Sequence, residues 1–535
     1  MGDIAWPGHS VWAGSDIVAA GHYLVAETAM AVLEEGGTAA DAAVAAAAAA
    51  AVTMPDMCGL GGEAFCLWFE PGSAPVAALG SGALPAAAPV EALRRAGQRL
   101  LSLYGGPSVA VPGAVRLWAD LHAGRGVKSW KRLLDPAIRL AREGFVVDRR
   151  LAASLAEHAG RLAAVEAAGA RFLCAGRPLR EGERLVQPEL AEALEALAAN
   201  GPDALYTGPL AAALVRAVDR AGGWLSGEDL TRHRTEWAEP LALDYRGVTV
   251  WQTPPPSQGI VVLEALGILA RRWDGEGDWR ESDWTVHLLL ESLKRAFGDR
   301  RRYLGDPRYV SFDARSLLAP DYLDAAAAAI GERATPYPWR PASGDTMSFV
   351  IVDRAGRAVS FIQSLALAFG SGVFVAEGGF FLNNRAGRSV DLDPASPNQA
   401  QGGKRPMHTL NAWMATNNGT LWAVGNTFGG DGQPQWNVQA LVDLIDGRLL
   451  PHEVVSRPRL TLAPATDVHT LDDPHTVAFE ARFAGDVVEG VRRRGHPVRY
   501  VGPWDASGSL QIVVRRDGGL AGASDPRAVG MTIGR

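Results

Sequence analysis

The character of this sequence changes sharply about two thirds of the way along the chain, and that change limits how it can fold. Residues 129–330 carry apolar side chains mostly at helical spacing. A polar, proline-rich connector then ends at Thr346, and two β-rich runs follow it, at 347–352 and 358–364. The residues between these runs, 353–356, suit a tight turn, so the pattern predicts a β-hairpin. We therefore expect a large, mostly helical part followed by a smaller, strand-rich part.

The first quarter of the chain predicts two helices and a strand joined by glycine turns. Residues 22–35 have helical periodicity, the glycine pair at 36–37 ends that helix, and Thr38 suits the N-cap of the next one. The run 42–52 is made only of Ala and Val and is much shorter than the roughly 20 apolar residues of a membrane span. It therefore predicts a helix buried inside the protein, and the glycine-rich turn 59–62 leads from there into an apolar strand.

Other elements follow from the same patterns. Amphipathic spacing predicts helices at 133–143 and 286–297, and a further helix is expected at 434–444. The remaining strand-like runs are 241–252, 410–415, 421–425 and 510–514.

Composition excludes several classes of function. The 535 residues include 52 basic and 59 acidic side chains, so a formal net charge of −7 predicts neither a nucleic-acid footprint nor a polybasic membrane patch. Hydrophobic residues make up 47% of the chain, which is ordinary for a globular protein of three or four domains, or of fewer large ones. Three scattered cysteines, and first residues without a basic and then apolar leader, predict a reducing, cytoplasmic location.

Common catalytic and cofactor motifs are missing from the sequence. It contains no His-Glu-x-x-His, no Cys-x-x-Cys and no Gly-x-Ser-x-Gly, and its histidines are scattered. The run 402–404, Gly-Gly-Lys, lacks the spacing of a phosphate-binding loop. We therefore expect no metal, no nucleotide and no other cofactor.

One arrangement in the sequence does carry chemistry. If the bond between Asp345 and Thr346 were cleaved, Thr346 would become the first residue of a core strand, with its hydroxyl beside its own α-amine. A free α-amine has a pKa of about 7.7–8.0, so near neutral pH it can accept the proton of a hydroxyl that is otherwise a poor nucleophile. The alternative is that Thr346 merely begins a strand, where threonine is common.

The sequence also resembles the γ-glutamyltranspeptidases and related acylases of the N-terminal-nucleophile hydrolase class, along nearly its whole length. The matches before the connector are 35–45, 59–62, 111–115, 133–138, 143–145, His287, Glu291, Lys294, Asp299 and Arg300. The matches from the connector onward are Asp345, Thr346, Asp353, 369–372, 382–384, 404–406, Gly429, Gly430 and 522–527.

This resemblance implies an α+β fold, a four-layer αββα sandwich with a helical region in the large subunit. It implies self-cleavage before Thr346 into a large subunit, 1–345, and a small subunit, 346–535, and it allows two such heterodimers to pair. Ser364 falls where the family keeps a hydroxyl close to the nucleophile. Gly429 and Gly430 fall where backbone N–H groups form the oxyanion hole, although a simple turn is the alternative for this pair.

The sequence departs from the family where γ-glutamyl substrates are held. The family uses an arginine to bind the substrate α-carboxylate, and this sequence has Ala83 in that segment instead. After Asn384, Arg385 stands where the family has a glutamine and Arg388 where it has an aspartate. The remaining departures are Ala366 for an asparagine, and His408 and Thr409 for a serine pair.

These changes alter the charge of the substrate site. A substrate ammonium about 4 Å from Arg388 would be repelled by about 4 kcal/mol at an effective dielectric of 20, whereas a carboxylate would be attracted. The alternative is that Arg385 and Arg388 point to solvent and pair with Asp391 or Asp393. His408 is either a polar contact in the acyl pocket or a packed loop histidine.

Together these observations predict an amidohydrolase or acyltransferase with Thr346 as nucleophile, Gly429 and Gly430 as oxyanion donors, and Ser364 and Thr409 as supporting hydroxyls. The preferred substrate is a small-molecule amide with a carboxylate-bearing acyl group, oxamate-like or glutaryl-like. A true γ-glutamyltransferase or glutathione hydrolase is the alternative within the family. A folded but non-catalytic binding or scaffold protein is the alternative from another class.

Overall fold

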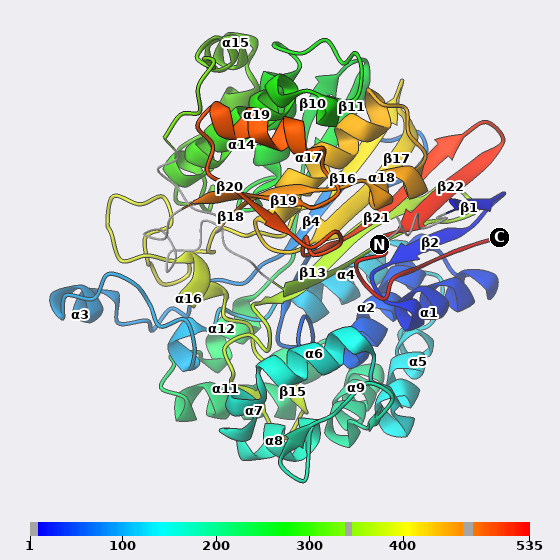
Figure 1. Ribbon diagram of the computed structural model, residues 1–535. Helices are drawn as coiled ribbons and strands as arrows, with labels where there is room; N and C mark the ends of the chain where they lie inside the picture. The colour runs from blue at the N-terminus through cyan, green and yellow to red at the C-terminus, as the bar shows by residue number, and fades with distance from the viewer. Residues whose placement is uncertain (1–8, 337–344, 464–474) are drawn as a thin grey trace.

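Two seven-stranded antiparallel sheets lie face to face at the centre of the molecule (Figure 1). The structure is a computed structural model that describes residues 9–336, 345–463 and 475–535, so connector residues 337–344 lie outside the described residues. In spatial order the first sheet contains β1 (Val11–Ala13), β22 (Gly519–Ser524), β21 (Ser509–Arg516), β17 (Thr420–Phe428), β16 (Trp413–Asn417), β11 (Val248–Gln252) and β10 (Leu241–Tyr245). The second contains β23 (Met531–Gly534), β2 (Ile17–Ala20), β12 (Asp345–Val352), β13 (Ala358–Ala366), β3 (Glu63–Phe69), β4 (Val76–Gly80) and β9 (Glu236–Ala238).

Both sheets combine strands from before and after residue 346. In the second sheet β13 pairs with β12 on one side and with β3 on the other, and in the first sheet β16 pairs with β11. Apolar side chains such as Phe65, Ile362, Met414 and Val513 fill the space between the sheets. The helical and strand-rich parts of the sequence therefore share one core rather than forming separate bodies.

Helices cover the outer face of each sheet, which completes four layers. The second sheet is covered by α1 (Tyr23–Glu34), α2 (Ala39–Thr53) and α4 (Ala114–Arg125), and the first by α13 (Gly259–Leu269), α14 (Asp283–Tyr303) and α17 (Gly432–Ile445). Every residue of α2 is buried, because alanine side chains let its neighbours approach closely. Thr38 and Asp41 cap its first turn reciprocally, as the sequence predicted for Thr38.

The remaining elements surround these layers. The other helices are α3 (Val90–Arg95), α5 (Trp130–Glu143), α6 (Arg149–Glu157), α7 (Ala159–Ala163), α8 (Glu166–Phe172), α9 (Pro188–Asn200), α10 (Asp203–Tyr206), α11 (Pro209–Arg220), α12 (Gly227–Arg232), α15 (Pro320–Ala328), α16 (Arg385–Ser389), α18 (Pro451–Ser456) and α19 (Gly485–Arg493). A three-stranded sheet contains β18 (Leu460–Ala463), β19 (Thr476–Glu480) and β20 (Val498–Val501), and short pairs join β14 (Phe374–Val375) to β15 (Phe380–Phe381), β5 (Phe145–Val146) to β8 (Arg184–Leu185), and β6 (Leu173–Cys174) to β7 (Arg177–Pro178).

Most local predictions are confirmed, and two are corrected. The hairpin after the connector forms β12 and β13, but the strand-like run 241–252 is itself a hairpin of β10 and β11. Its turn residues Arg246 and Gly247 both have positive φ, which reverses the chain within two residues. The strand expected at 410–415 begins only at Trp413.

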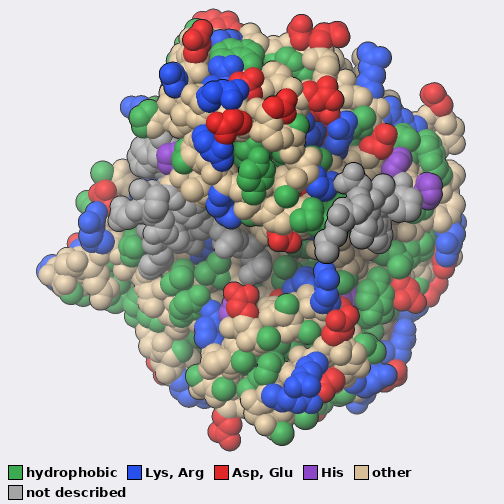
Figure 2. Space-filling view, viewed as in Figure 1, with side chains coloured by type: hydrophobic (Ala, Val, Ile, Leu, Met, Phe, Trp, Pro, Cys, Tyr) green, Lys and Arg blue, Asp and Glu red, His purple; other side chains and the backbone are tan. Residues whose placement is uncertain are grey.

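The outer surface mixes charges of both signs. Figure 2 shows acidic and basic side chains interspersed over the viewed face, and α3 projects from one side of the body in Figure 1. Among the residues that the structure describes, no helix combines the length and the apolar character needed to cross a bilayer.

Candidate active site

Thr346 lies near the start of β12, a central strand of the second sheet. The pairing of β12 with β13 is irregular between Asp345 and Met347, and such a bulge changes the direction of a side chain. The Thr346 side chain is buried, and its Oγ1 donates a hydrogen bond to Oγ of Ser364 at 3.2 Å. The structure thus brings together the two hydroxyls that the sequence placed side by side.

The backbone next to Ser364 is strained. Ser364 Oγ also accepts a hydrogen bond from the backbone N–H of Ala366 at 2.8 Å, and Ala366 has a φ of +82°. This left-handed conformation is uncommon for alanine and better tolerated by asparagine, the residue that the family keeps here. Ala366 pairs directly with Asp345 across the ladder, so the strain lies beside the expected cleavage point.

Gly429 and Gly430 form the turn between β17 and α17, where the first N–H groups of a helix have no partner inside it. Gly429 has a φ of +122°, and a Cβ there would lie 2.5 Å from the ring of Trp436. Arg300 and Asp431 form a buried bidentate ion pair beside the turn, with N–O distances of 2.7 and 3.0 Å. Glycine is therefore required at 429, and the turn is held from two sides.

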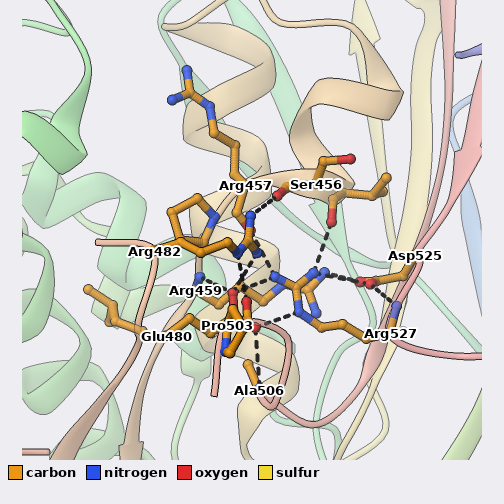
Figure 3. A network of polar contacts seen from close by, with 12 residues as sticks. Ser456, Arg457, Arg459, Glu480, Arg482, Pro503, Ala506, Asp525 and Arg527 are labelled. Atoms are coloured by element: carbon orange, nitrogen blue, oxygen red, sulfur yellow. Dashed lines mark hydrogen bonds and ion pairs between the residues drawn. The ribbon is translucent and has the colours of Figure 1, made fainter. Parts of the chain in front are cut away.

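Behind Trp436 lies a buried ionic network (Figure 3). Glu480 and Asp525 are its carboxylates, and Arg459, Arg482 and Arg527 are its cations. Arg527 contacts Glu480 through Nε at 2.7 Å and Nη2 at 2.6 Å. Burial alone would raise the pKa of Asp525, but Arg459 and Arg527 lower it overall.

A second buried ionic cluster lies on the other side of Ser364, and it is centred on Glu63. Glu63 pairs with Ser364 in the ladder between β3 and β13. Its Oε2 accepts hydrogen bonds from Arg385 Nε at 3.0 Å and from His408 Nε2 at 2.8 Å, and its Oε1 accepts one from the Gly82 N–H at 3.1 Å. Sequence reasoning missed Glu63, although an acidic residue beginning an otherwise apolar strand was a visible signal.

Hydrogen-bond direction fixes the state of His408. The backbone N–H of Leu410 donates to His408 Nδ1, so Nε2 carries the proton that faces Glu63. Burial and the nearby Arg385 lower the pKa of His408 to about 4, so the ring is neutral at neutral pH. Burial would raise the pKa of Glu63, but His408 and Arg385 lower it overall, which keeps the carboxylate charged.

The alternative in which the two arginines point to solvent is wrong. Arg385 and Arg388 are 0% and 2% exposed, because α16 packs them inward. Arg385 pairs with Glu63, whereas Asp391 lies 3.6 Å from Arg301. Arg388 Nη1 donates to the carbonyl oxygen of Ala366 at 2.9 Å. Ala366 is the residue that pairs with Asp345 in the β-ladder, so this guanidinium contacts the strand directly opposite Asp345.

Asn384 and Thr409 also belong to this region. The Asn384 side chain donates to Leu103 O at 3.0 Å and accepts from Leu367 N–H at 3.1 Å, so it ties two loops together. Thr409 Oγ1 accepts from Arg385 Nη1 at 3.3 Å. Where γ-glutamyl enzymes are expected to carry an arginine, Ala83 receives a backbone hydrogen bond from Val111.

A continuous set of contacts joins the Gly429–Gly430 turn to Thr346. Gln258 Nε2 donates to the carbonyl oxygens of both Gly430, at 3.1 Å, and Thr409, at 2.6 Å. From Thr409 the contacts run through Arg385, Glu63, Ser364 and Thr346. One site therefore holds a buried threonine hydroxyl, a glycine turn at a helix N-terminus, and two buried guanidinium groups.

Comparison with known proteins agrees with this arrangement. The layers and the threonine at the start of a central strand define the fold of an N-terminal-nucleophile hydrolase. The solved cephalosporin acylase from Bacillus halodurans has this fold. Its structure matches all of this chain and 98% of its own, with a TM-score of 0.91 and 32% identity. The family described as γ-glutamyltranspeptidase matches residues 25–534. The chain belongs to that family and is an enzyme of its hydrolase or acyltransferase class.

Two curated relatives cover nearly the full length. The oxamate amidohydrolase proenzyme of Klebsiella pneumoniae is 37% identical over 523 residues, which is 96% of this chain and 97% of that protein. The glutathione hydrolase-like YwrD proenzyme of Bacillus subtilis is 34% identical over 529 residues, which is 98% of this chain and 99% of that protein.

Proposed function

We propose that this chain is a self-processing enzyme that uses Thr346 to cleave amides with a carboxylate-bearing acyl group. The observation that carries the proposal is the buried Thr346 hydroxyl at the head of a core strand, hydrogen-bonded to Ser364 and joined by contacts to the Gly429–Gly430 turn. The proenzyme names of the two full-length relatives support the self-processing step.

Maturation comes first in this scheme. In the uncut chain the nitrogen of Thr346 belongs to a peptide bond and cannot act as a base. Its Oγ1 attacks the carbonyl carbon of Asp345 and loses its proton, the C–N bond breaks as the leaving nitrogen takes up a proton, and an ester joins Asp345 to Thr346. Water then hydrolyses the ester, which leaves a carboxylate at residue 345 and a free α-amine at residue 346.

Turnover uses the amine that maturation releases. The α-amine of Thr346 takes the proton of Oγ1 as the oxygen attacks the substrate carbonyl, and it then passes that proton to the departing amine. The N–H groups of Gly429 and Gly430 stabilise the developing oxyanion, and losing one such donor typically costs about 100- to 1,000-fold in rate. Water or an acceptor amine then releases the acyl group.

The acyl preference rests on charge. We assign the substrate carboxylate to Arg388, because its Nη1 lies 2.9 Å from the carbonyl oxygen of Ala366, which pairs with Asp345 immediately before Thr346. A guanidinium fork attracts a carboxylate and repels the ammonium that a γ-glutamyl group would bring. The activity named for the Klebsiella relative, an oxamate amidohydrolase, supports an acyl group of this kind. The cytoplasmic location and the pairing of two heterodimers remain predictions.

The self-processing step is tested by full-length wild type, Thr346→Ala and Thr346→Ser on a denaturing gel. We expect two unequal bands for the wild type, one for Thr346→Ala, and slower cleavage for Thr346→Ser, which keeps a hydroxyl. Mass spectrometry should place Thr346 at the start of the smaller fragment. An active wild-type enzyme with an uninterrupted chain would overturn the mechanism, and one full-length band in both the wild type and Thr346→Ala would favour a scaffold.

The acyl preference is tested on the processed enzyme with oxamate, a glutaryl amide and γ-glutamyl-p-nitroanilide. We expect kcat/KM to be higher for the first two, and Arg388→Gln to lower it by about 10- to 100-fold, the size of a lost charge-assisted hydrogen bond. A KM for the γ-glutamyl compound comparable to that of the carboxylate amides would support the glutathione hydrolase alternative instead.

A further inference from the structure

A third buried polar cluster lies between α14 and the loop that follows α19, and the proposed reaction does not use it. His287, Glu291 and Lys294 follow one another on α14 at spacings of four and three, so they share one face of the helix. His496 reaches them from the other element, and all four side chains are buried. The sequence scatters its histidines, but folding brings His287 and His496 together across 209 residues.

The donors and acceptors in this cluster can be arranged in only one way. Lys294 Nζ only donates, so His496 Nδ1, 3.3 Å away, must accept. His496 Nε2 then carries a proton and donates to His287 Nδ1 at 2.8 Å. His287 Nε2 in turn donates to the carbonyl oxygen of Gly331 at 2.9 Å, which only accepts. Both rings are therefore neutral, and each carries its proton on Nε2.

The same cluster holds the last described residues before the connector. Lys294 Nζ donates to the carbonyl oxygen of Thr335 at 3.1 Å, and the Thr335 hydroxyl and N–H donate to Glu291. The Ala334 N–H donates to Arg494 O at 2.8 Å, two residues before His496. Residues 331–335 are thus fixed by α14 on one side and by the small-subunit loop on the other.

A metal ion is the competing occupant. The ligand atoms of His287, Glu291 and His496 lie within 4.8 Å of one another among the described residues. However, Lys294 Nζ lies 2.8 Å from Glu291 Oε1 and also contacts His496, so its ammonium already occupies the position of a cation. The two imidazole rings are moreover hydrogen-bonded to each other, so the nitrogens in that contact are not directed at a shared metal ion.

We propose that His287, Glu291, Lys294 and His496 form a clamp that holds the carboxyl end of the large subunit against the small subunit and so positions the connector for cleavage at Thr346. The proposal rests on the self-processing proposed above. Only residues 336–345 separate the clamped Thr335 from Thr346. Fixing both ends of so short a segment lowers the entropy that must be lost to bring the scissile bond to the hydroxyl.

The test compares two substitutions at one position. Gln at 496 can accept from Lys294 and donate to His287, whereas Phe can do neither. In cell-free synthesis of the full chain we expect His496→Phe to be processed at least threefold more slowly than wild type, and His496→Gln at nearly the wild-type rate. The kcat and KM of each fully processed enzyme should match those of the wild type, which a general loss of structure would not allow.

A milder variant and a second readout keep the result clear. Thr335→Val removes only one hydroxyl at an exposed position, and it should slow processing in the same direction. Hydrogen exchange in the uncut Thr346→Ala background reports the clamp without any cleavage: adding His496→Phe should expose the amides of Ala334 and Thr335, and adding His496→Gln should not.

Three outcomes would overturn the clamp. One is equal processing rates for the Phe and Gln variants, and another is unchanged exchange at residues 334 and 335. The third is a stoichiometric metal, found by elemental analysis of the purified wild type and lost in His496→Phe. A wild-type chain that never cleaves would instead refute the proposed function, and the exchange experiment would still decide whether the clamp exists.

Discussion

The cluster around Glu63 and the network around Glu480 both bury carboxylate and guanidinium groups, but the two have different roles. In the network, the Glu480 carboxylate pairs with the permanently charged guanidinium groups of Arg482 and Arg527. In the cluster, Glu63 is shared between Arg385 and a neutral imidazole. All the charged members of the network lie between residues 459 and 527, whereas the cluster joins segments from both sides of Thr346.

This difference separates a structural task from a functional one. Guanidinium groups remain charged at every working pH, so the network keeps one state and braces β19, β22 and, through Trp436, the Gly429–Gly430 turn. The cluster contains a histidine and adjoins Thr346, so its charge balance changes only as the pH falls toward about 4, the pKa of His408. Substitutions in the network should therefore change stability, and substitutions in the cluster should change selectivity as well.

The largest effect is expected in the network. Arg527→Met leaves Glu480 and Asp525 without their shared cation, and removing one partner of a buried pair typically costs about 3–5 kcal/mol. Urea denaturation of the processed enzyme measures this loss, and kcat at low temperature should stay near the wild-type value. Arg216→Met, which breaks an exposed pair with Glu377, is the control and should cost less than about 1 kcal/mol. Equal losses for the two variants would contradict the assigned role of the network.

The next effect is a pH dependence that belongs to the cluster. The pKa of His408 is lowered from 6.5 to about 4, so between these pH values the unfolded chain binds a proton that the folded chain does not. The free energy of unfolding should therefore fall as pH drops from 6.5 to 4, by on the order of 3 kcal/mol. Denaturation of wild type and His408→Gln across this range measures it, because the variant lacks the titrating ring.

The network should behave differently over the same range. The pKa of Asp525 lies below its ordinary 3.8, so its contribution to stability is present above that value and is lost only as pH falls further. Arg527→Met should therefore keep the part of the slope between pH 6.5 and 4 that His408 contributes. A slope that flattens in Arg527→Met but not in His408→Gln would reverse the comparison.

A smaller effect is expected at the centre of the cluster. Glu63→Gln keeps the shape of the side chain but removes the charge that balances Arg385, which should destabilise the protein by about 2 kcal/mol. The added net positive charge should also raise the ratio of kcat/KM for a carboxylate amide to that for its neutral analogue. Glu70→Gln, an exposed residue immediately after the same strand, is the control. An unchanged ratio in Glu63→Gln would show that the cluster does not set selectivity.

The smallest effect concerns the hydroxyl between the cluster and the nucleophile. Ser364→Ala removes the partner of Thr346 Oγ1 and should lower kcat about three- to tenfold, the worth of one ordinary hydrogen bond. Ser360→Ala removes a buried hydroxyl from the same strand that bonds to Gly425 O instead. The two variants should lose similar stability, and only Ser364→Ala should lose rate.

Local pattern explains what could be foreseen. The capped alanine helix, the hairpin of β12 and β13 and the helix after Gly430 were all predictable, because each depends on residues within a few positions of one another. The turn at Arg246 was missed because arginine rarely adopts the positive φ of the first central position, where Asn, Asp or Gly is usual. The partners of Arg385 and Arg388 were beyond local reasoning, since solvent exposure of α16 depends on what packs over it.

The sequence by itself predicted most helices and strands, though not all of their limits, and it singled out Thr346; its resemblance to a known family added Ser364 and the Gly429–Gly430 turn. Periodicity and turn chemistry act over a few residues, so the chain carries that information directly. Only the tertiary structure decided that Arg385 meets Glu63, 322 residues away, and that His287 meets His496. Such pairs form because burial makes an unsatisfied charge or ring nitrogen costly, and burial is a property of the packed molecule rather than of any segment.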